Sequence, residues 1–304
     1  MFAIDYDQLC WSVPDGFSLE SIRLRVPQGS FFGLLGPQGC GKSALLRLTM
    51  GLLRPTAGTI TILGNDSVMR AHKVRRQCTY APSELSAEAA YDSRLRVREF
   101  LAGAMSARGK VDHSRIGELC QRFQLDRQAK LSWLDDGERK RLILAMALLP
   151  EAPLILLDEP SLYLTRPERQ AVFSELLRQH QNGSTVFFTT RSIQELRLYT
   201  THSALMTDSG ILCGGETASM AILHARRITV AVEEAIQTLV EALGLVNYTS
   251  AGNTISFFFT GDMDRLVKTL GRFRVLTLRI EEPALESALA AYHIMGGSEH
   301  AQTV

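Results

Sequence analysis

The sequence predicts an α/β protein with a mostly parallel sheet, followed by a small α+β domain. Strands and helices alternate through the first two thirds of the chain, which is typical of a sheet covered by helices on both faces. A glycine-rich turn, GPQGCGKS, stands between an apolar run and a helical pattern. The pattern changes near Gly214 and Gly215. We therefore predict one domain over residues 1–215 and a second over 216–304.

The first domain opens with two predicted strands. Residues 22–26 alternate apolar and charged side chains, which is typical of a half-buried strand, and residues 30–35 form a short apolar run. The apolar spacing then predicts the remaining elements in order. These are a helix over 44–53, a strand over 58–63, helices over 97–107, 114–124 and 139–149, a strand over 154–157, a helix over 167–180 and a strand over 185–189.

The second domain has its own repeating order. From residue 227 the pattern predicts a strand, a helix over 233–243, two strands, a helix over 262–270, a strand, and a helix over 284–293. This β-α-β-β-α-β order indicates a compact split-βαβ unit. The last residues, SEHAQTV, are predicted to fray.

The glycine-rich turn fits the pattern G-x-x-x-x-G-K-[ST] that cradles phosphates. Glycines let several backbone N–H groups face one anion, and the following helix adds its positive N-terminal dipole. Lys42 can reach the β- and γ-phosphates, and Ser43 can bind Mg²⁺. The predicted nucleotide-binding residues of this loop are Gly36, Pro37, Gln38, Gly39, Cys40, Gly41, Lys42, Ser43 and Ala44. We interpret Cys40 as a small residue that fits the loop.

An acidic pair completes the predicted nucleotide site. The apolar strand in LILLDEP, residues 154–160, ends at Asp158, which is suited to hold Mg²⁺. Glu159 follows, and it could polarise an attacking water molecule as a general base. The sequence thus predicts a site for ATP and Mg²⁺.

Composition excludes several classes of protein. The net charge of +1 gives no global attraction to nucleic acid or to a membrane surface. No apolar run approaches the roughly 20 residues that span a bilayer, and the acidic start is not a secretory signal. Five scattered cysteines without a CxxC pair indicate reduced thiols rather than a disulfide framework or a zinc site.

These motifs, with the flanking RLRVPQGSFFGLLGPQGCGKS and LRVREFLAGAMSARG, resemble the ATP-binding subunit of an ABC transporter over nearly the whole chain. The resemblance implies a P-loop NTPase fold: an ABC ATPase core with a helical subdomain over about residues 84–145. The C-terminal part, ending in EEPALESALAAYHIMGG, is similar to the tail of the drug- and lipid-exporter branch.

The resemblance also marks a changed signature motif. The family reads L-S-G-G-Q where this chain has LDDGE, so Asp135 replaces a serine, Asp136 replaces a glycine, and Gly137 is kept. In the family this motif caps the ATP held by the phosphate loop of a second subunit. A carboxylate about 4 Å from a phosphate oxygen costs roughly 4 kcal/mol at an effective dielectric of about 20. Asp135 and Asp136 would also serve as N-caps of the helix over 138–149, and both can hold at once, so that the fold is kept while the sensor is lost.

Three further family positions are altered. Ser83 stands where the family has a glutamine that contacts Mg²⁺, Thr165 replaces an aspartate, and Arg191 replaces the switch histidine. We place His202 late on the helix after Arg191, where it cannot substitute for that histidine. Trp11 is the candidate aromatic residue for stacking on adenine, although a core role is an equal alternative.

The resemblance implies a nucleotide-binding subunit of an ABC exporter, on the cytoplasmic face of the cell membrane, with weak intrinsic hydrolysis. Its implied partners are a separate membrane permease and a second ATP-binding subunit, as a homodimer or, preferably, a heterodimer. One alternative is a non-hydrolysing regulatory or scaffold subunit paired with an active ATPase. Another is a soluble ABC protein on ribosomes or DNA, which the neutral charge and single phosphate loop disfavour. We therefore expect no nucleic acid partner.

Overall fold

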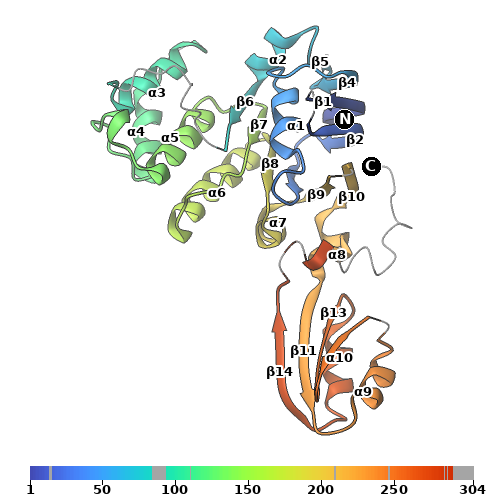
Figure 1. The fold of residues 1–304 in the computed structure, drawn as a ribbon. Coiled ribbons are helices and arrows are strands. Elements are labelled where there is room, and N and C mark those ends of the chain that lie inside the picture. Colours follow the sequence, from blue (N-terminus) through green and yellow to red (C-terminus); the bar gives the residue numbers. More distant parts are fainter. Residues whose placement is uncertain are drawn as a thin grey trace. The chain divides into compact units, whose positions relative to one another are not determined.

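The computed structural model describes residues 1–13, 16–83, 94–109, 111–208, 210–245, 247–283, 285 and 287–289. Contacts within the chain divide it after Thr217 into two compact units. Figure 1 shows the elements of both units. Each unit has its own hydrophobic core, and each is described by itself.

A six-stranded sheet forms the centre of the first unit. Its strand order is β10-β9-β3-β8-β7-β6, and all neighbours are parallel except β10 and β9. The strands are β3 (Phe31–Leu35), β6 (Cys78–Ala81), β7 (Leu154–Leu157), β8 (Thr185–Thr190), β9 (His202–Thr207) and β10 (Gly210–Glu216). Strands β3, β7 and β8 are buried along their whole length, and β3 and β7 are accordingly apolar throughout, whereas β8 places three threonines around Val186, Phe187 and Phe188.

A second, antiparallel sheet belongs to the same unit. Its order is β2-β1-β4-β5, formed by β1 (Phe2–Ser12), β2 (Ser18–Pro27), β4 (Ala57–Ile62) and β5 (Asn65–Asp66). Strand β1 was not predicted, because its buried positions do not alternate regularly. Register shifts interrupt its pairing with β2, and Gln8 has a φ of 48°.

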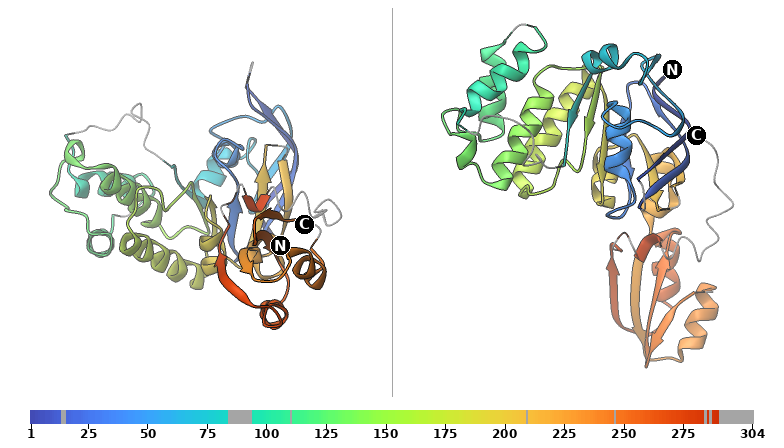
Figure 2. Two further views of the ribbon diagram at one scale, coloured as in Figure 1. Left: turned by 60° about the horizontal axis from the view of Figure 1, so that its bottom comes forward. Right: turned by 45° about the horizontal axis from the view of Figure 1, so that its top comes forward.

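Alternate side chains of the central sheet enter two different cores. Phe31, Phe188 and Leu157 pack with α5 (Asp136–Leu148) and α6 (Arg166–Gln181) on one face. Phe32 and Phe187 pack on the other face with α1 (Lys42–Thr49) and the antiparallel sheet. Figures 1 and 2 show this sandwich, with the strands lying between α1 and α6.

The remaining helices of the unit are short. They are α2 (Ala71–Gln77), α3 (Val97–Ser106), α4 (His113–Arg122) and α7 (Ile193–Tyr199), with a 3₁₀ turn over Leu131–Trp133. Helices α3 and α4 share the core of α5 and form the helical part of the unit. The predicted subdomain over residues 84–145 includes residues 84–93, which lie outside those described.

The second unit contains a four-stranded antiparallel sheet in the order β12-β13-β11-β14. Its elements are α8 (Ala221–His224), β11 (Arg226–Val232), α9 (Ile236–Leu243), β12 (Thr249–Ala251), β13 (Thr254–Phe259), α10 (Met263–Leu270) and β14 (Val275–Glu281). A 3₁₀ turn over Thr217–Ser219 precedes them. Most of the helix predicted over 284–293, and the predicted tail, lie outside the described residues.

Two predicted helices are at least three residues shorter at one end in the structure, and α5 begins three residues earlier than predicted, at Asp136. Helix α1 ends at Thr49 rather than at residue 53, because Gly51 turns the chain with a φ of 63°. Helix α9 begins at Ile236 rather than at residue 233. The residues before it are held elsewhere: Glu233 N–H donates to Arg274 O at 3.0 Å, and the Glu234 carboxylate accepts from Arg274 N–H at 2.9 Å.

Candidate functional site

The glycine-rich loop connects the carboxyl end of β3 to the start of α1. Gly41, directly before Lys42, has a φ of 99°, and Gly39 has a φ of 86°, a region that side-chain-bearing residues rarely adopt. A Cβ on Gly36 would lie 2.5 Å from Met206 O. The loop therefore needs glycine for its backbone path, as phosphate-binding loops do.

Lys42 lies beneath this loop. Its side chain is 4% exposed, and Nζ donates to Gly36 O at 2.7 Å and to Pro37 O at 2.6 Å. Cys40 is buried, and burial raises the pKa of its thiol more than the charge of Lys42 lowers it. The thiol is therefore protonated at neutral pH, in keeping with its interpretation as a small packing residue.

Asp158 follows the buried strand β7 and is 1% exposed. Its Oδ1 accepts a hydrogen bond from Thr189 Oγ1 at 2.7 Å, while Oδ2 has no hydrogen-bond partner among the described residues. An unpartnered buried carboxylate oxygen is costly unless it binds a ligand. Hard oxygen donors such as this carboxylate and the Ser43 hydroxyl fit Mg²⁺.

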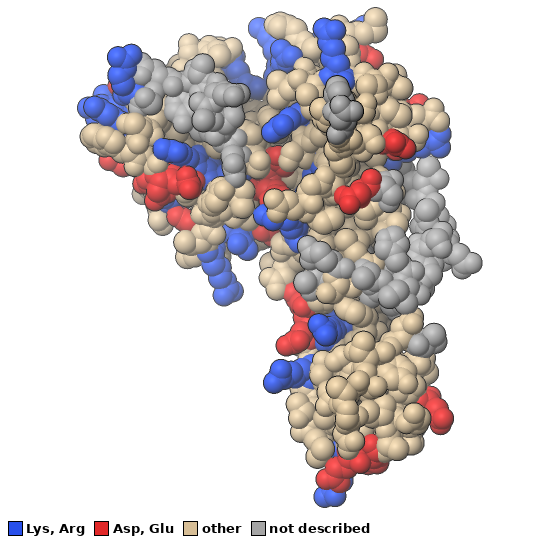
Figure 3. All heavy atoms as spheres, viewed as in Figure 1, with Lys and Arg blue, Asp and Glu red and all other residues tan. Residues whose placement is uncertain are grey.

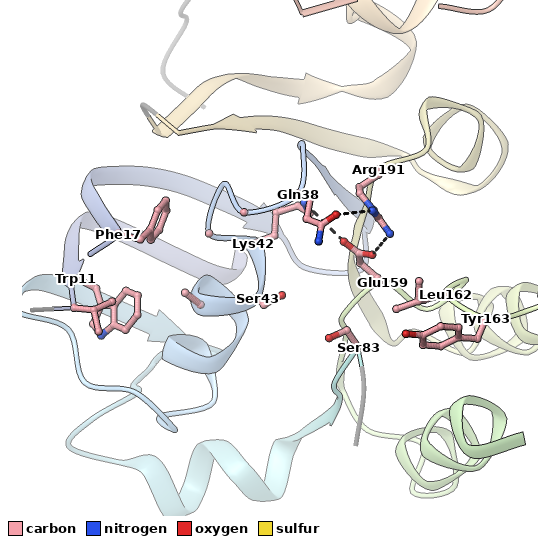
Figure 4. Close-up of a pocket in the computed structure, with 14 residues that line it drawn as sticks. Trp11, Phe17, Gln38, Lys42, Ser43, Ser83, Glu159, Leu162, Tyr163 and Arg191 are labelled. Carbon is pink, nitrogen blue, oxygen red and sulfur yellow. Dashed lines mark hydrogen bonds and ion pairs between the residues drawn. The ribbon is translucent and has the colours of Figure 1, made fainter. Parts of the chain in front are cut away.

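Two cations flank Glu159, the candidate base. Arg191 Nη2 lies 3.0 Å from Glu159 Oε2, and Lys42 Nζ lies 4.0 Å from Oε1. Arg191 also donates from Nη1 to Gln38 Oε1 at 3.3 Å, which ties it to the phosphate loop (Figure 4). Glu159 has a φ of 42°, an uncommon backbone conformation for a residue with a side chain.

A cavity of about 490 Å³ joins these residues. Trp11 and Phe17 lie toward one end, and Glu159 and Arg191 toward the other (Figure 4). It is lined by Trp11, Val13, Phe17, Gln38, Gly39, Gly41, Lys42, Ser43, Ala44, Ser83, Glu159, Leu162, Tyr163 and Arg191.

The two aromatic side chains at one end of the cavity, Trp11 and Phe17, are half-buried. Trp11 contacts the adjacent core and also lines the cavity, so a packing role and a nucleotide role are compatible. Sequence reasoning missed Phe17, whose signal was a second aromatic residue just before β2. It also missed Tyr163, which has a φ of 64°.

The changed signature motif begins α5. Asp135 is the N-cap: its Oδ1 accepts from Glu138 N–H at 2.7 Å, and Asp135 N–H donates to Glu138 Oε2 at 3.0 Å. This reciprocal pair is a capping box. The prediction that Asp136 also caps the helix is wrong, because Asp136 is its first residue and its side chain points to solvent. A Cβ on Gly137 would lie 3.2 Å from Tyr163 O.

Lys140, on α5, anchors the ends of two strands. It is 1% exposed, and Nζ donates to Ser83 O at 2.9 Å, Asp158 O at 3.0 Å and Pro82 O at 3.1 Å. The helix that carries the changed signature is therefore joined to the Ser83 position and to the Asp158 position.

The other altered positions lie at element ends. Thr165 precedes α6, where its N–H and hydroxyl both donate to Glu168 Oε2 at 2.7 Å. The placement of His202 on a helix is wrong, because α7 ends at Tyr199 and His202 begins β9. The short α7 leaves room for the chain to return to the sheet beside β3.

None of the helices in the described residues combines the length and the apolar character that a membrane span requires. Nor do three or more His, Cys, Asp or Glu side chains gather there to hold a metal ion.

Comparisons with known proteins agree with this geometry. Residues 19–162 match the family model described as ABC transporter. The chain is 35% identical over 191 residues to a daunorubicin resistance ATP-binding protein of Streptomyces coeruleorubidus, covering 60% of this chain and 58% of that protein. It is 30% identical over 197 residues to Nod factor export ATP-binding protein I of Rhizobium etli, covering 64% and 62%. The chain thus spans about three fifths of these two relatives.

A longer match extends into the second unit. An uncharacterized ABC transporter ATP-binding protein of Synechocystis is 28% identical over 280 residues, covering 88% of this chain and 76% of that protein. Among solved structures, an ATP-binding subunit of an ABC transporter superposes with a TM-score of 0.63 at 23% identity, covering 70% and 90%. A dimeric ATP-binding cassette bound to ADP and Pi gives 0.62 at 20%, covering 71% and 100%. The fold is therefore that of a P-loop ABC ATPase cassette.

Proposed function

Because this chain belongs to the ABC transporter family of ATP-binding proteins, we propose that it binds Mg-ATP as the nucleotide-binding subunit of an export system. The observation that carries the proposal is the cradle at residues 36–43 beside the unpartnered buried oxygen of Asp158. Ser43 and Asp158 would hold Mg²⁺, which neutralises phosphate charge when bound. The remaining contacts come from backbone N–H groups of the loop and from Lys42.

The partners are inferred from the relatives, whose names describe resistance and export ATP-binding proteins. We place the chain on the cytoplasmic face of a membrane, beside a separate permease, with closure of an ATP-bound dimer driving transport. The altered signature supports a heterodimer, since Asp135 and Asp136 would face the nucleotide of the second subunit. The second unit, built around residues 218–283, is proposed as an accessory or regulatory domain.

Weak hydrolysis by this chain's own site is the finer part of the proposal. A general base must accept a proton from water, and Glu159 is instead paired with Arg191 at 3.0 Å. The Arg191 guanidinium can stabilise bound ATP electrostatically while its ion pair engages the Glu159 carboxylate. Binding and turnover are separable, since catalysis needs groups placed for the transition state.

The same ion pair favours a second candidate function. A subunit that only holds ATP has no need of a free base, so a non-hydrolysing scaffold paired with an active ATPase would also keep Lys42 and Asp158. The two candidates differ in whether Glu159 contributes to turnover.

Steady-state ATP turnover of the purified native complex separates them, with Glu159→Gln introduced in this chain alone. If this site hydrolyses ATP, turnover falls by about 100-fold or more in the fraction contributed by this chain. Unchanged turnover, with ATP still bound and with binding lost in Lys42→Ala, identifies a scaffold. The matched control is Glu241→Gln, an exposed carboxylate on α9. A wild-type chain that does not bind ATP would contradict both candidate functions.

A further inference from the structure

The region around α2 concentrates positive charge that the neutral total conceals. Residues 51–77 contain five basic side chains and one acid, Asp66, for a net charge of +4, whereas the whole chain carries +1. Helix α2 buries only Val74 and turns its basic side chains outward. Figure 3 shows blue side chains over the region where Figure 1 places α2. The local field therefore differs from the one that the net charge indicates.

Large apolar side chains stand in the same region. Met69 is 87% exposed, Leu52 is 57% exposed and Val68 is 48% exposed. The turn that holds two of them is fixed, because Asp66 Oδ1 accepts from Val68 N–H at 2.9 Å and from Met69 N–H at 2.7 Å. The one acid of this segment is thus engaged in holding the turn.

Residues 50–52 lie beside α2. The Arg75 guanidinium donates to Gly51 O at 3.3 Å and to Met50 O at 3.5 Å. A Cβ built on Gly51 would lie 3.5 Å from Ser67 O and 3.9 Å from Ala71 Cβ. Leu52 therefore belongs to the same surface as the turn before α2. We call it the α2 surface, formed by Leu52, Val68, Met69, Arg70, Lys73 and Arg76.

Basic side chains around protruding apolar ones are the chemistry of a membrane interface. Each Lys or Arg within the potential of an anionic bilayer raises the partition coefficient about fivefold, and apolar side chains enter the headgroup region. A nucleic acid backbone would interact favourably with the basic side chains, but it would offer no apolar environment for Met69, Leu52 and Val68. The observations therefore favour a lipid surface over a nucleic acid.

We propose that the α2 surface binds anionic lipid headgroups directly, adding a lipid contact to the one with the permease. The proposal rests on the membrane location given under the proposed function. Lipid binding by this surface does not depend on ATP turnover or on the permease. The lipid proposal and the proposed function can therefore fail separately.

The test is flotation of the purified full-length chain with vesicles, without permease. We expect binding to phosphatidylcholine vesicles that contain about 30% phosphatidylglycerol, little binding to pure phosphatidylcholine, and loss of binding near 0.5 M salt. The variant Arg70→Glu/Lys73→Glu/Arg76→Glu should bind at least about tenfold more weakly. Met69→Ser should weaken binding without changing charge.

The control is Arg265→Glu/Lys268→Glu/Arg272→Glu, which makes the same change in net charge on and after α10, where these side chains are exposed. It should keep vesicle binding. Equal loss in both triple variants, binding to pure phosphatidylcholine, or no binding by the wild-type chain would overturn the proposal. ATP binding and thermal melting of each variant show that the fold and the nucleotide site are retained.

Discussion

At the residue scale, Asp135 has a structural role in the fold and a proposed effect on nucleotide sensing. The side chain that the signature needs as a hydroxyl is here a carboxylate, and it closes a capping box with Glu138. A carboxylate near a helix N-terminus also interacts favourably with the helix dipole. Asp135 therefore stabilises the start of α5, and its altered contact with a nucleotide remains part of the proposed function.

Two substitutions at this position separate those effects. Asp135→Ala removes the cap and should lower the free energy of unfolding by about 1 kcal/mol, whereas Asp135→Ser retains a capping oxygen and should change it little. Thermal or chemical unfolding of the full chain measures both. Equal stability of Asp135→Ala and the wild type would show that the cap contributes nothing.

Sequence could name residues at this scale but not their pairings. The phosphate loop and Asp158 follow from motifs that lie within single short segments. The contacts of Arg191 with Glu159 and Gln38 join three loops far apart in the chain, and only the parallel order β3-β8-β7 brings them together. Its place in the sequence identified Arg191 as an altered family position. The structure adds that its side chain contacts Glu159 and Gln38.

At the element scale, a buried ion cluster joins α4 to α6. Glu175 is fully buried on α6 and accepts hydrogen bonds from Arg115 and Arg122 on α4, from Arg178 at 2.8 Å and from Gln179 at 2.9 Å. Burial alone would raise the pKa of Glu175, but the hydrogen bonds from Arg178, Gln179 and Arg115 outweigh it, and the pKa falls to about 2.

This cluster predicts acid sensitivity. A carboxyl group with a depressed pKa stabilises the fold above its unfolded pKa, and that contribution is lost as pH falls from 4.5 toward about 2. The loss should reach about 3 kcal/mol. Urea unfolding across this range measures it. Glu175→Gln should be less stable at neutral pH and should lack this part of the pH dependence, while Glu241→Gln should follow the wild type. A wild-type profile that is flat below pH 4.5 would contradict the assignment.

The sequence predicted α4 and α6 but not their link. Apolar periodicity reports which face of a helix is buried, and it is insensitive to a charged side chain inside that face. Glu175 pairs with residues 53 and 60 positions away, a separation that local patterns do not encode. Strand β1 was missed for a related reason, since its bulges break the alternation.

At the scale of the whole molecule, the chain has separate cores. The first unit encloses one cluster on each face of its central sheet, and the second encloses a cluster around Ile228, Val230 and Phe257. The division of contacts falls after Thr217. The change in sequence pattern at Gly214 and Gly215 predicted a domain boundary at residue 216. Independent folding of the two parts stays a prediction.

Residues 1–217 should fold alone and bind ATP. Both clusters of the first unit and every residue lining the nucleotide cavity lie within this range. Cooperative unfolding and fluorescent nucleotide binding of the fragment test this, with Lys42→Ala in the fragment as the binding control. A fragment that unfolds without cooperativity would show that the second unit is needed for folding.

The anchor formed by Lys140 has an evolutionary consequence. Its ammonium donates hydrogen bonds to three backbone carbonyl groups, at Pro82, Ser83 and Asp158. Every amino acid supplies a carbonyl, so these three hydrogen bonds do not require a particular side chain at positions 82, 83 and 158. Glutamine or serine at position 83 would supply the same backbone carbonyl, so either residue would keep this contact at the end of β6. Substitutions at such a position can thus accumulate without losing these hydrogen bonds, even where they alter a proposed sensing role.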